Sequence, residues 1–138
     1  MTQLLRLHID VRAAMPASLE AVEEFFAEFR RKYQTLLDRA NCFAAELLLR
    51  EALNNAVLHG CRADPGQQVR CLLRLRERRL LIAVEHDGDG FDWRAARAGA
   101  AALSDCSGRG IEILRKYASH VRYNERGNAV AIVKRLSC

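Results

Sequence analysis

Three polar side chains recur at intervals of four residues in the middle of the chain. They are Glu51, Asn55 and His59, the last followed directly by Gly60. This spacing places side chains along one ridge of a helix. A proton-accepting carboxylate and a carboxamide therefore project together. An ordinary solvated helix face has the same spacing, so the pattern needs support from elsewhere in the sequence.

Two glycine-containing segments give that support. His86-Asp87-Gly88-Asp89-Gly90-Phe91-Asp92 follows an apolar run, and its two glycines allow the backbone to approach a flat ligand closely. Ser107-Gly108-Arg109-Gly110 comes immediately before a predicted helix. Unpaired backbone N–H groups and the helix dipole favour a phosphate at such a position.

In this order, the three segments resemble the N, G1 and G2 boxes of the GHKL (histidine-kinase-like) ATPase and kinase superfamily. The Glu-x-x-x-Asn-Ala-x-x-His-Gly form of the first segment is similar to that of the anti-sigma-factor serine/threonine kinases. The Gly-Phe-Asp ending of the second segment and the small size of the chain fit the same family. The resemblance covers about two thirds of the chain.

The resemblance implies a fold, two cofactors and a set of site residues. The fold would be an α/β two-layer sandwich, the Bergerat ATP-binding fold, with a mixed, mostly antiparallel sheet and helices on one face. The cofactors would be ATP and Mg²⁺, with Asn55 as the metal ligand and Glu51 as the general base toward a serine hydroxyl. The residues expected to contact the nucleotide are Asn55, His86, Asp87, Gly88, Gly90, Phe91, Gly108, Arg109 and Gly110.

The resemblance also implies partners. The substrate would be a serine of a STAS-type anti-anti-sigma protein, and the sequestered partner would be a sigma factor or another regulator. A homodimer is suggested by the resemblance alone. The expected activity is therefore phosphorylation of a protein serine, coupled to partner switching.

The sequence departs from the family pattern at two places. The G1 aspartate, which accepts a hydrogen bond from the adenine amino group in the family, is replaced by His86. Asp87 is adjacent, but neighbouring strand residues point to opposite faces. A neutral imidazole keeps one acceptor nitrogen, so we expect weaker adenine binding. Near the G2 box, Cys106 stands where these kinases can carry an arginine, and Arg109 contacts either phosphate or solvent.

Hydrophobic periodicity predicts the elements that position these residues. Leu5 to Ile9 alternates like a strand, and Ser18 is placed to cap a helix that carries several phenylalanines. The other expected elements are a helix over 41–59, strands over 69–75 and 80–84, a functional loop over 88–107, a helix over 110–119, and a closing hairpin over 121–136 that turns at 125–128.

Length and composition indicate one domain over residues 1–138. The five cysteines are odd in number and form no CxxC pair, which favours reduced thiols over a disulfide framework or a zinc site. The absence of a long apolar run or a signal-peptide pattern predicts a cytoplasmic protein with no membrane association. The net charge is +5, but the basic residues are not interleaved with aromatic residues. We therefore expect no binding to nucleic acid, while an acidic protein partner fits the charge.

Three competing functions stay open. The first is a non-catalytic module that sequesters a regulator and has a degraded adenine site, which His86 favours and Glu51 disfavours. The second is a histidine-kinase catalytic domain, although the first predicted helix contains no phosphoacceptor histidine. The third is a nucleic-acid-binding protein, for which aromatic–basic clustering is missing.

Overall fold

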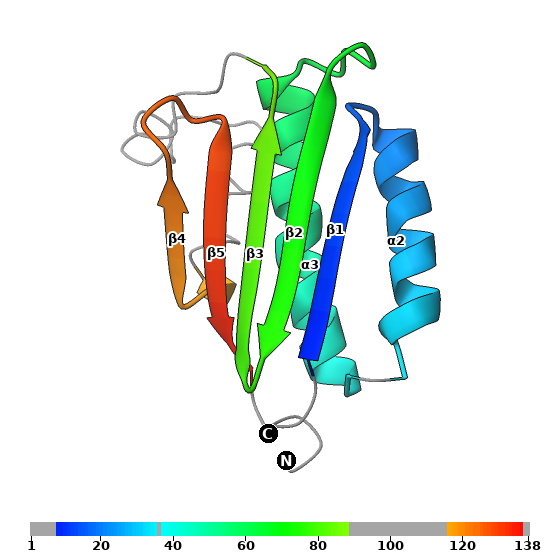
Figure 1. Ribbon diagram of the computed structural model, residues 1–138, viewed down its shortest axis with the longest axis vertical. Helices are drawn as coiled ribbons and strands as arrows, with labels where there is room; N and C mark the ends of the chain where they lie inside the picture. Colours follow the sequence, from blue (N-terminus) through cyan, green and yellow to red (C-terminus); the bar gives the residue numbers. More distant parts are fainter. Residues whose placement is uncertain (1–7, 36, 89–115, 137–138) are drawn as a thin grey trace.

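The computed structural model describes residues 8–35, 37–88 and 116–136, which form a helical layer on one face of a sheet (Figure 1). In chain order the elements are β1 (His8–Pro16), α2 (Leu19–Tyr33), α3 (Arg39–Asn55), the π-helical turn η1 (Ala56–Gly60), β2 (Gln68–Arg76), β3 (Arg79–His86), β4 (His120–Tyr123) and β5 (Ala129–Arg135). The five strands have the order β1-β2-β3-β5-β4, and every described pair is antiparallel. The predicted α/β sandwich is confirmed.

The hairpin of β2 and β3 is confirmed close to the predicted positions. Val69, Cys71, Leu73 and Leu75 of β2 are buried, and so are Leu80, Ile82 and Val84 of β3. The intervening positions face away from the helices, as the period of two requires. The chain turns at residues 77 and 78, where Glu77 has a left-handed φ of 57°. The arginines in this segment therefore lie on the open face of the sheet.

The first strand extends further along the chain than predicted. We expected a strand over residues 5–9, of which 5–7 lie outside the described residues, and β1 covers His8–Pro16 and pairs along its whole length with β2. Its inward positions include Ile9, Val11 and Met15, with Ala13 between the last two. Alanine makes the alternation of size weak in this part of the sequence, so only pairing with β2 defines the strand.

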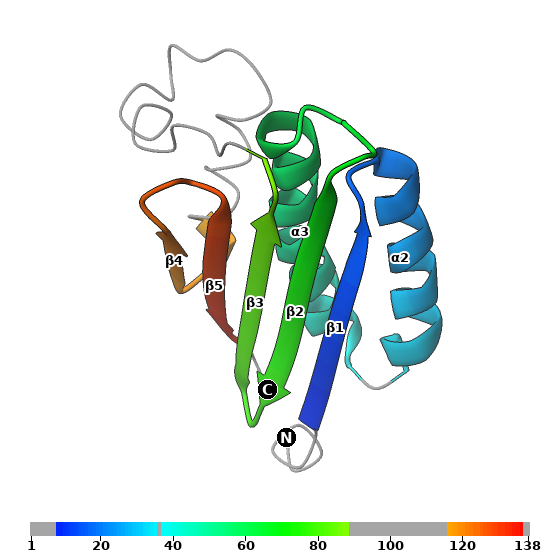
Figure 2. The same ribbon diagram turned by 45° about the horizontal axis from the view of Figure 1, so that its top comes forward.

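Both helices begin at side-chain caps. The Ser18 hydroxyl accepts a hydrogen bond from Ala21 N at 3.1 Å, which confirms the predicted cap of α2. Helix α3 begins two residues before the predicted start, because the Asp38 carboxylate accepts from Asn41 N at 2.7 Å. Figure 2 shows both helices packed on the same face of the sheet.

The core lies between the helices and the inward face of the sheet. Its largest fully buried side chains include Phe26 of α2 together with Leu48 and Leu53 of α3. Arg50 places its guanidinium 4.4 Å from the centre of the Phe26 ring and forms an ion pair with Glu23, which ties α3 to α2. Within the described segments, no helix is both long enough and apolar enough to cross a membrane.

The closing hairpin of β4 and β5 is confirmed, with a turn that contains Gly127 at a φ of 75°. A glycine favours this left-handed conformation because it has no Cβ. The helix predicted over 110–119 falls mostly outside the described residues. Cys42, Cys61 and Cys71 are free thiols, and burial raises the pKa of Cys71 to about 11.

Candidate functional site

The end of α3 carries the candidate catalytic residues. The α-helical hydrogen bonding stops at Asn55 and continues as the π-helical turn η1, in which Cys61 N donates to Ala56 O at 2.8 Å. We expected one regular helix through His59, so its end is a correction. A π turn is wider than an α turn, so His59 does not continue the ridge of Glu51 and Asn55. Such turns are frequent at functional sites.

Glu51 keeps its carboxylate half-buried on α3. Burial raises its pKa, and the neighbouring positive charge of Arg50 opposes this shift. Among the described residues, none forms a hydrogen bond or an ion pair with this carboxylate. A carboxylate with a raised pKa and free oxygens has the properties of a general base.

Asn55 lies one helical turn after Glu51 and faces the sheet. Its side chain is buried, and its Nδ2 has no hydrogen-bond partner among the described residues. It lines a cavity of about 20 Å³, which has room for about one water molecule. The other residues that line this cavity are Ala52, Ala56, Val84, His86, Tyr123, Gly127, Ala129 and Val130. The fold therefore brings Asn55 and His86 to one small cavity between α3 and the sheet.

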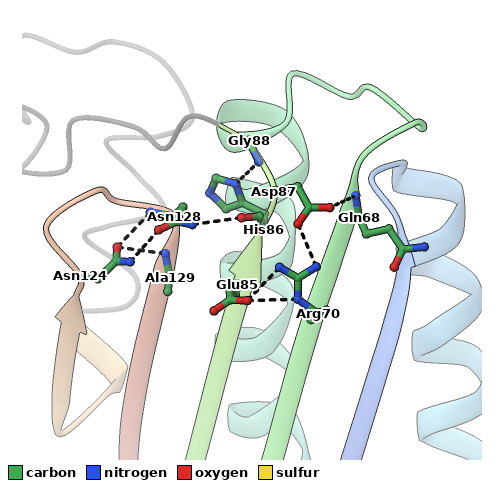
Figure 3. A network of polar contacts seen from close by, with 9 residues as sticks. All are labelled: Gln68, Arg70, Glu85, His86, Asp87, Gly88, Asn124, Asn128 and Ala129. Atoms are coloured by element: carbon green, nitrogen blue, oxygen red, sulfur yellow. Dashed lines mark hydrogen bonds and ion pairs between the residues drawn. The ribbon is translucent and has the colours of Figure 1, made fainter.

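The His86 side chain is closely packed at the end of β3. Its ring is buried, and its Nδ1 accepts a hydrogen bond from Gly88 N at 3.1 Å (Figure 3). The ring lies so close to Gly60 that a Cβ on that glycine would be 2.3 Å from the His86 Cε1 atom. A Cβ on Gly88 would lie 1.9 Å from the Gly60 carbonyl oxygen. The ends of η1 and β3 thus meet backbone to backbone around the imidazole.

This contact bears directly on the predicted adenine role of His86. A neutral imidazole has a single acceptor nitrogen, and here Gly88 N–H occupies it. In this conformation the ring has no free acceptor for an adenine amino group. Adenine recognition by His86 therefore requires the imidazole to leave Gly88, and the predicted role stays a prediction with that condition.

Asp87 lies on the opposite side of the strand from His86. Its carboxylate accepts from Arg70 Nη1 at 3.0 Å and from Gln68 N at 3.2 Å (Figure 3). The hydrogen bond from Arg70 is the main reason that the pKa of Asp87 is lowered. Arg70 also donates to Glu85, so these charges form a small network on the open face of the sheet. Asp87 is directed away from the cavity that Asn55 lines.

Two asparagines, which we did not predict as site residues, hold the end of β3. Asn128 O accepts from His86 N at 2.9 Å, and Asn128 Nδ2 donates to His86 O at 3.3 Å. The Asn124 side chain accepts from Asn128 N at 3.0 Å, which fixes the turn between β4 and β5. Asparagines in a turn are a general turn pattern, and only the tertiary contact links this one to His86.

The other predicted nucleotide contacts lie outside the described residues. They are Gly90, Phe91, Gly108, Arg109 and Gly110. Of the predicted site, the structure therefore describes Glu51, Asn55, His86, Asp87 and Gly88. It brings Asn55 and His86 together with Gly88, which follows the end of β3. Glu51 lies one helical turn before Asn55.

Comparison with protein families agrees with this geometry. Residues 13–134 match the family described as the histidine kinase-like ATPase domain. Since the match spans most of the chain, the protein belongs to this family. The domain is therefore an ATP-binding, kinase-like ATPase domain of the GHKL type. A search of curated proteins found no significant match to the sequence.

The buried imidazole makes stability depend on pH. Burial lowers the pKa of His86; the backbone of Gly127 and the charge of Asp87 oppose this shift, while Arg126 and Arg70 add to it. Below about pH 6.5, the ordinary histidine pKa, the unfolded chain binds a proton that the folded chain does not. Stability is therefore lost as the pH falls from that value toward the lowered folded pKa.

We expect this histidine to contribute up to about 1.4 kcal/mol of lost stability per pH unit in that window. Urea unfolding of wild type and His86→Gln at pH 7.5, 6.5 and 5.5 measures it, because the difference between the two proteins removes the contribution of the carboxylates. His8→Gln, an exposed position, serves as the control. Parallel pH profiles for wild type and His86→Gln would show that His86 does not titrate differently on unfolding.

Proposed function

We propose that this chain is an ATP-dependent serine protein kinase and anti-sigma factor that acts by partner switching. Its substrate would be a STAS-type anti-anti-sigma protein, and it would sequester a sigma factor or a similar regulator. The observation that carries the proposal is the half-buried Glu51 carboxylate of raised pKa, one helical turn before the buried Asn55. Membership of the ATPase family supports the use of ATP.

The residues have distinct roles in this proposal. Glu51 accepts the proton of the substrate serine hydroxyl, and its raised pKa brings it nearer to neutral pH, where a general base is most effective. Asn55 supplies an amide oxygen to Mg²⁺, which neutralises phosphate charge when it is bound. By the family resemblance, the segment from Gly108 to Gly110 would contact the phosphates, and Gly90 and Phe91 would contact the nucleotide.

The described residues fit a metal ion that is held mainly by nucleotide. In the described part of the chain, no group of three or more His, Cys, Asp or Glu side chains is placed to hold a metal ion. Mg²⁺ at a phosphate site usually takes one or two protein oxygens, with phosphate and water completing its shell. A single asparagine at the end of α3 meets that requirement.

The direct test is a phosphotransfer assay with the protein, labelled ATP, Mg²⁺ and a STAS-type antagonist. Phosphoserine on the antagonist, dependent on Mg²⁺ and on the kinase, is the expected result. The matched control is an antagonist in which the acceptor serine is replaced by alanine. Labelling of that control to the same extent, or no labelling of either protein, would contradict the proposal.

A second function is favoured by a specific observation. The only acceptor nitrogen of His86 is occupied by Gly88, and the cavity beside Asn55 holds about one water. These features fit a non-catalytic or weakly nucleotide-binding module that sequesters a regulator and has a degraded adenine site. The two functions can be compared by placing the family's aspartate at position 86 and measuring its effect on nucleotide binding.

We expect His86→Asp to tighten ATP binding several-fold. A carboxylate has two oxygens, so one can keep the Gly88 N–H while the other accepts from the adenine amino group. One additional hydrogen bond corresponds to roughly 0.5–1.5 kcal/mol. Calorimetric titration of both proteins measures it, and circular dichroism checks the fold. Weaker binding by a folded variant would mean that His86 is not a weakened adenine anchor.

A further inference from the structure

A row of three arginines, with one histidine at its end, crosses the open face of the sheet at the end opposite to the candidate site. The sheet register places His8 beside Arg76, Arg76 beside Arg79, and Arg79 beside Arg135. We call these four residues the cationic row. Neighbouring strands are about 4.8 Å apart, so the row spans ~14 Å over four strands. Neither described helix covers this face (Figure 1).

Most charges of the cationic row lack a carboxylate partner. Arg76 meets Asp10 at 3.5 Å, but Asp10 also pairs with Arg74 at 3.3 Å. Arg79 and Arg135 form no ion pair with any residue that the structure describes. Like charges directly opposite each other in a sheet are destabilising. A fold that keeps such a row is locally frustrated, and this kind of conflict is expected at functional sites.

The cationic row lines a hollow of about 790 Å³. Arg78, His120 and the carboxylate-bearing Glu77 also line it. Four arginines therefore face the hollow against one carboxylate, and two of them, Arg79 and Arg135, have no ion-pair partner among the described residues. This excess of guanidinium groups calls for an anionic ligand that brings its own acceptors.

We propose that this hollow binds an acidic peptide segment of a partner protein. The cations form a line and do not converge on one point, which suits a series of carboxylates better than a single phosphate. Acidic residues three or four positions apart on a helix are about 5–6 Å apart, close to the spacing of the row. Guanidinium groups also match carboxylates bidentately.

Other polyanions fit the hollow less well. Single-stranded nucleic acid is held by stacking on aromatic side chains, and none lines the hollow. Membrane surfaces need exposed apolar side chains beside the charges. The exposed large apolar residues of the described chain are Leu19, Phe43, Leu58 and Tyr117, and none of them lines the hollow.

This binding site goes beyond the proposed kinase function and does not depend on it. Arg79 begins β3 and His86 ends it, so at about 3.3 Å per residue the two are ~23 Å apart along the strand. Loss of peptide binding and loss of nucleotide binding can therefore be measured separately on the same variants.

The test uses a fluorescein-labelled helical peptide with four glutamates along one face, measured by fluorescence anisotropy. We expect Arg79→Gln and Arg135→Gln each to weaken binding about ten-fold, the effect of one charge-assisted contact. Arg39→Gln, an exposed position on α3, is the matched control and should bind like wild type. ATP affinity should be the same in all four proteins.

Two further measurements test the specificity of peptide binding and the stability of the variants. A peptide of the same composition, with its glutamates spread around the helix, should bind at least several-fold more weakly. Removing one charge of the cationic row relieves repulsion, so Arg79→Gln should melt at the same or a higher temperature. Equal binding by all variants, or binding of the spread peptide, of oligo(dT) or of anionic vesicles as tight as that of the striped peptide, would overturn the proposal.

Discussion

Replacing Glu51 with glutamine is expected to abolish phosphotransfer while nucleotide affinity stays within a few-fold of wild type. The amide keeps the shape of the side chain but cannot accept the serine proton. General-base catalysis contributes roughly 10²- to 10⁴-fold to the rate, so the loss should be of that order. Single-turnover transfer from labelled ATP to a STAS-type antagonist measures the chemistry, and calorimetry measures binding.

Two other substitutions sharpen this result. Asn55→Ala should weaken Mg²⁺-dependent ATP binding, because it removes the proposed oxygen ligand. Glu20→Gln, an exposed carboxylate in the first turn of α2, should change neither quantity. Equal phosphotransfer by Glu51→Gln and wild type would remove Glu51 from the role of base, and an unchanged titration of Asn55→Ala would remove Asn55 as metal ligand.

Gly88→Ala should destabilise the fold by roughly 3 kcal/mol and separate the two backbones that form the site. A Cβ at this position would lie 1.9 Å from the Gly60 carbonyl oxygen, and a backbone atom cannot move away as a flexible side chain can. Gly88 does not have a left-handed φ, so the cost is steric. Urea unfolding measures the stability, and ATP titration reports on the site.

A pair of comparisons separates this contact from general intolerance of alanine. Gly66→Ala is the matched control, because its Cβ would meet only the exposed Asp64 carboxylate, at 3.2 Å. Gly60→Ala clashes with the His86 ring, so adding His86→Ala to it should recover part of the stability lost in the single variant. If Gly88→Ala is as stable as Gly66→Ala, the close packing of η1 against the end of β3 is wrong.

The two proposed sites lie at opposite ends of one strand. One end of β3 carries His86, at the candidate nucleotide site, and the other end carries Arg79, in the cationic row. If both proposals hold, a partner could occupy the hollow without covering the nucleotide site. Partner binding and phosphorylation would then be separable by mutation, which is what a partner-switching protein needs.

Local patterns were sufficient to predict several elements. The alternation of apolar and charged residues in β2 determines which side of that strand is buried, because successive strand side chains point to opposite faces. Ser18 was identifiable as a cap, because its hydroxyl needs only the backbone of the next turn. The opposite directions of His86 and Asp87 follow from the same alternation of two.

Other features depend on contacts between distant segments. The position of β1 is set by its pairing with β2, since small alanines leave its own alternation weak. The π turn after Asn55 occurs where Gly60 meets His86, twenty-six residues later in the chain. Periodicity within one helix carries no information about such a partner.

From the sequence alone, the order of the three segments could be read directly, and their resemblance to the superfamily boxes implied the fold class. The sequence also located the departure from the family pattern in the second segment, His86. Only the tertiary structure decided that the acceptor nitrogen of His86 is occupied by Gly88, and that His8, Arg76, Arg79 and Arg135 share one row. A hydrogen-bond partner and a strand register are relations between segments, and the free energy that fixes them comes from packing the whole sheet against its helices.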